Sequence, residues 1–106
     1  MEDKLLQIAI EIIYYAGNAR KLVTDALTAL KEKDANTAKL KLEQAEVEIR
    51  LAHASQSNLL QQEAEGDPMS VSLLMVHAQS TLMVAMSEQH MAQAMIEIVE
   101  AYSKSE

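Results

Sequence analysis

The stretch that decides the fold is DPMSVSLLMVHAQSTLMVAMSE, residues 67–88. Between its acidic ends it carries no formal charge, and a single histidine, His77, lies in its middle. Apolar residues wrap most of the circumference of the helix that this spacing predicts, and such a helix must be buried on most sides. Because two neighbouring helices would cover only part of that surface, we expect the segment to lie at the centre of a homo-oligomer.

Two breaks divide the 106-residue chain into three helical segments. In KEKDAN, Asp34 is placed to cap the helix that follows. In AEGDP, Gly66 can end a helix in the left-handed conformation, and Asp67 and Pro68 suit the start of the next one. The sequence therefore predicts an all-α, antiparallel three-helix bundle in one domain that spans residues 1–106. We expect the helices to cover about residues 2–32, 35–64 and 68–103.

Composition and charge exclude several classes of function. The net charge of −7 argues against a nucleic-acid partner, and the absence of cysteine excludes disulfides and thiolate chemistry within the chain. The N-terminus has acidic residues and no basic region before its apolar stretch, so we expect a cytoplasmic protein without a signal peptide. The hydroxyl and amide groups after Asp67 would lack partners in lipid, which argues against membrane insertion. Without a glycine-rich phosphate loop, direct use of a nucleotide is not expected.

Methionine is unusually frequent in the third segment. Six of the seven methionines lie between Met69 and Met95, whereas the only aromatic residues are three tyrosines. Methionine is a flexible, apolar side chain that fills irregular gaps in cores. We interpret these residues as core filler, with a partner-binding surface as the alternative.

The motif VSLLMVHAQSTLM, residues 71–83, resembles the active-site helix of the lactose/cellobiose-type enzyme IIA of the bacterial phosphotransferase system. The opening IAIEIIYYAGNARKLVTDALTALKEKD resembles the first helix of that family, with Gly17 and Ala19 in its Ser/Ala-Gly-x-Ala region. The segment AKLKLEQAEVEIRLAHASQSNLLQQEAEG resembles the second helix, including the Ala52-His53 pair. The resemblance covers the whole chain in effect.

This resemblance implies a homotrimer that packs nine helices together, with the third helix of each subunit central. It also implies a phosphotransferase component that carries a phosphoryl group on His77. Proteins of the family accept this group from the histidine phosphocarrier protein and pass it to a cysteine of the matching enzyme IIB. The sugar that is imported and phosphorylated is then a β-linked disaccharide, such as lactose, cellobiose or diacetylchitobiose.

The motif departs from the family at two positions. The family sequence His-Ala-Gln-Asp-His-Leu-Met is here His77-Ala78-Gln79-Ser80-Thr81-Leu82-Met83. In the family, three copies of the aspartate approach one another near the trimer axis and can hold a metal ion. Ser80 removes both the repulsion between carboxylates and the need for a cation, so we expect a metal-independent trimer with no cofactor. Thr81 removes a titratable group one helical turn from His77.

The chemistry expected of His77 needs no separate base. A neutral imidazole has one ring nitrogen free to attack phosphorus in line, and histidine is mostly neutral at cytoplasmic pH. By resemblance, Gln79 is a possible donor to a phosphoryl oxygen. Residues two apart do not share a helix face, so any such help is expected to act on the next subunit's site. The residues expected to exclude water and receive both partners are Leu73, Leu74, Val76 and Met83.

A rival hypothesis is a helical assembly or regulatory protein that has kept the scaffold and lost phosphoryl transfer, and the changes at Ser80 and Thr81 motivate it. Without the resemblance, His77 would be interpreted as a structural histidine, since buried histidines on apolar helices usually have hydrogen-bond partners. His53 and His90 are interpreted as structural or surface residues, and no spacing of the histidines favours a metal site.

Overall fold

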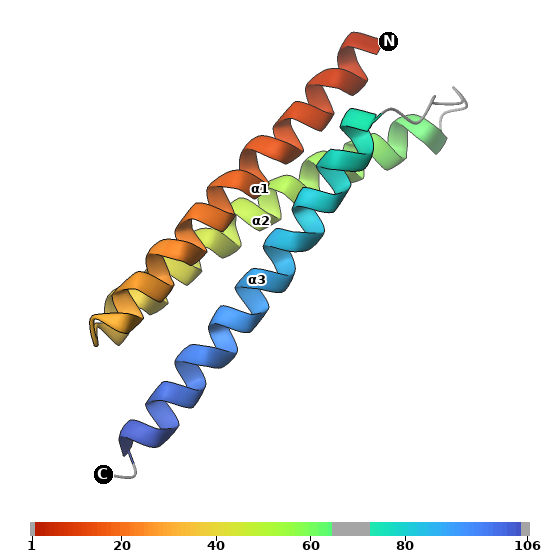
Figure 1. Ribbon diagram of the computed structural model, residues 1–106. Helices are drawn as coiled ribbons and strands as arrows, with labels where there is room; N and C mark the ends of the chain where they lie inside the picture. Colours follow the sequence, from red (N-terminus) through yellow and green to blue (C-terminus); the bar gives the residue numbers. More distant parts are fainter. Residues whose placement is uncertain (1, 65–72, 105–106) are drawn as a thin grey trace.

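The computed structural model describes residues 2–64 and 73–104, which form three long helices (Figure 1). Helix α1 spans Glu2–Lys31, α2 spans Ala35–Ala64 and α3 spans Leu73–Lys104. Successive helices run in opposite directions, so α1 and α3 are parallel to each other and α2 is antiparallel to both. The bundle is elongated, with extents of 60 × 19 × 18 Å. The predicted all-α, antiparallel three-helix bundle is confirmed.

The helix boundaries agree closely with those expected from the sequence. Helix α1 ends one residue earlier than predicted, α2 has the predicted bounds, and α3 continues to Lys104. The predicted break at Gly66, Asp67 and Pro68 lies outside the described residues. Over the parts of the chain that are described, no helix is long and apolar enough to cross a membrane.

The turn between α1 and α2 is held by main-chain and side-chain hydrogen bonds. The N–H of Asp34 donates to the carbonyl of Ala29 at 2.9 Å, and that of Lys33 donates to Leu30 at 3.0 Å, which closes the end of α1. Lys33 adopts a left-handed conformation with φ 65°. The predicted cap at Asp34 is confirmed, because its carboxylate accepts hydrogen bonds from the hydroxyl and N–H of Thr37 at 2.7 and 3.1 Å. These two bonds lower the pKa of Asp34.

Alanine makes up most of the core of the bundle. It recurs at intervals of seven residues, which is two turns of a helix and keeps it on one face. Small side chains at such intervals let helix axes approach closely. The largest fully buried side chains are Ile12, Leu82 and Ile96. The buried alanines are Ala9, Ala16, Ala19, Ala26 and Ala29 in α1, Ala38, Ala45 and Ala52 in α2, and Ala78, Ala85 and Ala92 in α3.

The interpretation of methionine as core filler is wrong for most of α3 within one subunit. Met83, Met86, Met91 and Met95 are exposed, and only Met75 packs against the core as a half-buried side chain. The alanine-lined seams between helices leave little space for long side chains. Within one subunit these methionines therefore belong to the surface of α3.

Ion pairs between partly exposed side chains join α3 to the other two helices. Nε and Nη2 of Arg20 in α1 donate to the two carboxylate oxygens of Glu88 in α3, at 2.8 and 3.2 Å. This hydrogen bond, with the charge of Glu88, raises the pKa of Arg20. Lys39 of α2 forms an ion pair with Glu100, which lies near the C-terminal end of α3. The pair Arg20–Glu88 thus defines which levels of α1 and α3 lie side by side.

Candidate functional site

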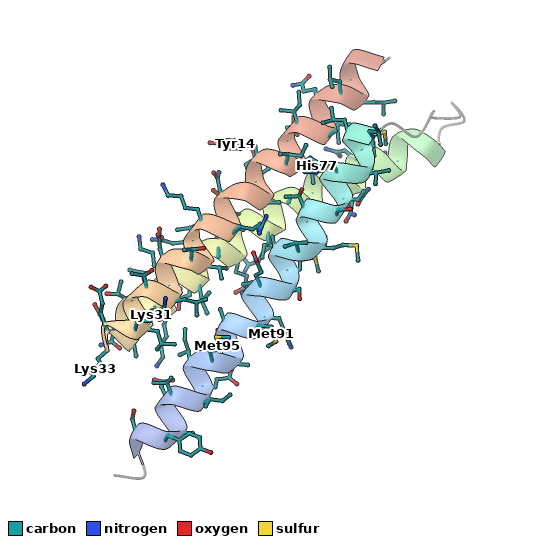
Figure 2. All side chains as sticks on the ribbon, in the orientation of Figure 1. Tyr14, Lys31, Lys33, His77, Met91 and Met95 are labelled. Atoms are coloured by element: carbon teal, nitrogen blue, oxygen red, sulfur yellow. The ribbon has the colours of Figure 1, made fainter. Side chains whose placement is uncertain are left out.

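His77 lies in the second turn of α3, near one end of the bundle, and its side chain is exposed (Figure 2). An imidazole in this position can be reached by a second protein. The hydroxyl of Thr81, one turn further on, donates to the backbone carbonyl of His77 at 2.7 Å. At the position where the family has a second histidine, the side chain therefore bonds to the main chain of the helix rather than to the imidazole.

Three of the four predicted partner-binding residues are exposed on the same helix as His77. The exposed fractions are 89% for Leu73, 50% for Val76 and 69% for Met83. Leu73 lies four residues before His77 and therefore shares its helix face. Leu74 differs from the other three, because it is half-buried and packs against the core.

Gln79 faces α2 and not the side of α3 that carries His77. Its side-chain oxygen accepts a hydrogen bond from Nε2 of Gln56 in α2, and both side chains are half-buried. A residue two positions from His77 is turned by about 200° around the helix axis, in accord with this contact. Sequence reasoning missed Gln56, since no spacing or motif in α2 marks it as a partner of α3.

The residues at positions 80 and 81 do not fit the axial metal of the family. Ser80 is exposed and offers a neutral hydroxyl, and the hydroxyl of Thr81 is bonded to the main chain. Divalent cations are usually held by carboxylates, imidazoles or thiolates in proteins. Within residues 2–64 and 73–104, no group of three or more acidic, histidine or cysteine side chains could hold a metal ion. His53 is half-buried in α2, and His90 is exposed on α3.

One face of α3 points away from the other two helices and carries much apolar surface. Small residues recur on it every seven positions, at Ser80, Ser87 and Ala94. We call this surface, including the side chains that flank these small residues, the α3 outer face. Apart from the three side chains near His77, its exposed large hydrophobic residues are Val84, Ile98 and Tyr102.

A mostly apolar groove of about 330 Å³ runs between α1 and α3 beyond the level of Glu88. Met91 and Met95, which lie further along α3 than His77 (Figure 2), form part of its wall. The other lining residues are Val23, Thr24, Leu27, Ser87, Glu88 and Ala92.

Comparisons with known proteins agree with this architecture. The family model of the lactose/cellobiose-specific IIA subunit of the phosphotransferase system matches residues 7–100. The lichenan-specific phosphotransferase enzyme IIA component of Bacillus subtilis is 42% identical over 104 residues, which are 98% of this chain and 92% of that protein.

Two solved structures share the fold over nearly their whole length. The crystal structure of PtcA from S. mutans has a TM-score of 0.90 at 38% identity, and the match covers 94% of this chain and 98% of that one. The IIA(Chitobiose) protein of the Escherichia coli phosphotransferase system, solved in complex with HPr, has a TM-score of 0.78 at 33% identity, with 93% and 96% covered. The chain therefore belongs to the lactose/cellobiose-specific IIA family, the enzyme IIA components of the sugar phosphotransferase system.

Proposed function

We propose that this protein accepts a phosphoryl group on His77 from the histidine phosphocarrier protein, HPr, and passes it to the cysteine of a cognate enzyme IIB. The observation that carries the proposal is the exposed imidazole of His77, which lies in an uncharged stretch of α3. The transport system so served takes up and phosphorylates a β-linked disaccharide. The relative named for diacetylchitobiose, a β-linked disaccharide, supports that class of sugar.

In the first step, the lone pair of a ring nitrogen of His77 attacks the phosphorus of the donor's phosphohistidine. The P–N bond of the donor breaks, and its electron pair returns to the donor imidazole. In the second step, the thiolate of enzyme IIB attacks the same phosphorus, and the electron pair of the second P–N bond returns to His77. Since one bond is exchanged for a similar bond, the role of the protein is mainly to position the reacting atoms.

The apolar side chains around His77 support docking of two successive partners. Leu73, Val76 and Met83 would exclude water from the reacting phosphorus, with Leu74 beneath them as a half-buried support. A flexible thioether such as that of Met83 can adapt to two different partner surfaces. Gln79, which faces away from His77 within its own subunit, would donate to a phosphoryl oxygen on the neighbouring subunit's site.

The α3 outer face supports a homotrimer in which three copies of α3 lie together at the centre. Exposed apolar surface of this extent marks an interaction site. The small residues Ser80, Ser87 and Ala94 recur at the seven-residue interval that keeps one face of a helix towards its partners in a coiled coil. Such an assembly would cover apolar surface of α3 and would need no metal ion at Ser80. The rival hypothesis, a helical assembly or regulatory protein that has lost phosphoryl transfer, is not favoured, because relatives of this chain are named as IIA components.

Intact-mass spectrometry tests the proposal directly. The wild type, His77→Ala and His90→Ala are incubated with phosphoenolpyruvate, enzyme I and HPr. His90→Ala is the matched control, because His90 is also an exposed histidine of α3. We expect an acid-labile phosphoryl addition on the wild type and on His90→Ala, none on His77→Ala, and the same oligomeric mass for all three. A wild type that stays unmodified, or a phosphorylated His77→Ala, would refute the proposal.

A further inference from the structure

A hydrogen bond joins α2 to α3 at the end of the bundle that carries His77. Nε2 of Gln56 in α2 donates to Oε1 of Gln79 in α3, and both side chains are half-buried. The oxygen and the nitrogen of a side-chain amide branch from the same planar carbon, so they point in different directions. With its oxygen held towards α2, Gln79 turns its NH2 group, which has two N–H donors, away from Gln56.

Gln79 and His77 lie on opposite flanks of the α3 outer face. Successive residues of an α-helix are rotated by about 100° around its axis. Ser87, in the middle of this face, follows His77 by ten residues and Gln79 by eight, which places these two side chains about 80° to either side of it. Glu88, eleven residues after His77, bonds to α1, so His77 lies on the flank next to α1. Gln79 lies on the flank next to α2.

These two flanks meet between subunits in the proposed trimer. In a ring of three copies related by rotation, each contact joins two different surfaces of the chain. When the α3 outer faces surround the axis, the α1 flank of one α3 therefore faces the α2 flank of the next. A rotation about an axis parallel to the helices keeps every residue at its level, and His77 and Gln79 differ in level by only about 3 Å. Gln79 of one subunit is thereby brought beside His77 of its neighbour.

We propose that Gln56 is a positioning residue for phosphoryl transfer, which holds Gln79 so that its NH2 group faces the phosphoryl oxygens on the neighbouring subunit's His77. The inference rests on the proposed function and assigns a role in the same site to a residue of α2. As the P–N bond of the donor breaks and the bond to His77 forms, negative charge is spread over three equatorial oxygens. N–H donors already aimed at these oxygens stabilise that charge, whereas an amide oxygen in the same place would repel it.

An unrestrained glutamine would present such a donor only part of the time. Its side chain has several rotatable bonds, and its amide can turn either the oxygen or the NH2 group towards a neighbour. Gln56 removes this freedom before the donor arrives, because its N–H group attracts the oxygen of Gln79 and repels the NH2 group. Gln56 does not touch the phosphoryl group in this arrangement, so its effect on transfer must pass through Gln79.

Gln56→Glu and Gln56→Met test the polarity of the contact with little change in size. An ionised carboxylate at position 56 can only accept, so Gln79 would turn its NH2 group towards it and its oxygen towards the phosphoryl group. Methionine has a similar length and a good helix propensity, and it leaves the amide of Gln79 unrestrained. Gln61→Glu, at an exposed position of α2, is the control for the added charge.

The rate of phosphoryl transfer from phosphorylated HPr is measured by rapid quenching and intact-mass spectrometry. At saturating HPr we expect Gln56→Glu to be at least about tenfold slower than the wild type, with Gln56→Met between them. Gln61→Glu should react at the wild-type rate. The HPr concentration that gives half the maximal rate and the oligomeric mass should be the same for all variants. A Gln56→Glu variant as fast as the wild type would overturn the inference.

Mixed oligomers separate positioning across the subunit interface from a structural defect. Subunits with Gln56→Glu are coexpressed with an excess of His77→Ala subunits, which cannot be phosphorylated but supply a Gln79 held by the natural Gln56. Each Gln56→Glu subunit then has neighbours whose amides face the phosphoryl group correctly, and we expect its His77 to be phosphorylated at the wild-type rate. Intact mass distinguishes the two kinds of subunit. If the Gln56→Glu subunits stay slow in the mixture, Gln56 acts within its own subunit and the inference is wrong.

The wild type separates this inference from the proposed function. A wild type that is never phosphorylated refutes phosphoryl transfer, and the role of Gln56 with it. A wild type and a Gln56→Glu variant that are phosphorylated on His77 at the same rate refute the role of Gln56 alone.

Discussion

Replacement of Lys33 by glycine should stabilise the protein. Lys33 lies in the turn after α1 with φ 65°, a left-handed conformation that costs an L-residue with a Cβ roughly 1–2 kcal/mol. Glycine removes this cost, but it also makes the unfolded chain more flexible. This second effect reduces the gain in stability by about 0.4–1 kcal/mol. The hydrogen bonds that Lys33 and Asp34 donate here come from main-chain N–H groups, so they survive the change. The net gain is roughly 0.5–1 kcal/mol for each chain.

Lys31→Gly is the matched control, because it removes the same charge two residues earlier, where α1 is still helical. There glycine should cost up to about 1 kcal/mol relative to a good helix former, because Lys31 is the last residue of the helix. Urea unfolding at fixed protein concentration should therefore place the two variants on opposite sides of the wild type, separated by up to roughly 2 kcal/mol. Both lysines lie at the opposite end of the bundle from His77 (Figure 2), so phosphorylation should be unchanged. A Lys33→Gly variant no more stable than Lys31→Gly would refute the argument from backbone strain.

Two further predictions concern the helix cap and the position of the family's metal ligand. The pKa of Asp34 is lowered in the folded protein, so its contribution to stability is fully present above the unfolded-state value and is lost as pH falls through the folded-state value. Asp34→Ala should thus be less stable than the wild type in urea unfolding at neutral pH, and this difference in stability should shrink as the pH is lowered. A difference that grows on acidification would show that the pKa of Asp34 is not lowered by folding. Ser80→Asp should weaken self-association at least about tenfold unless a divalent cation is supplied, because like charges would meet near the axis. The oligomeric mass measured by sedimentation, with a chelator and with added Mg²⁺, checks this prediction. A wild type that dissociates in the chelator would show that its assembly still requires a metal ion despite Ser80.

Helix bounds could be predicted from the sequence because local signals determine them. Asp34 caps α2 as the sequence predicts, and it accepts the hydrogen bond of the Thr37 N–H. The motif around His77 was also recognisable, because the resemblance extends over all three helices. The exposure of His77 depends on which face of α3 the other helices cover, and no local pattern specifies that.

The composition of the core could not be predicted in the same way. Patterns of hydrophobicity assign large apolar residues to the interior, yet Met83 and Leu73 are exposed while Ala85 is buried. Alanine contributes little to such a pattern, although its small size is what brings the helices together. The contact between Gln56 and Gln79 depends on the relative rotation of α2 and α3, which sequence spacing does not determine.

A core built from alanine changes which mutations the fold can tolerate. Most cores are damaged when a large side chain is cut short, because a cavity remains. Ala45, Ala52 and Ala85 have almost no side chain to shorten. The destabilising substitutions at these positions are those that introduce a larger residue and force two helices apart. The large apolar side chains on α3 can vary in size and shape without disturbing the packing beneath them. Substitutions at these exposed positions of α3 can therefore change the contacts that this subunit makes with other proteins without changing its fold.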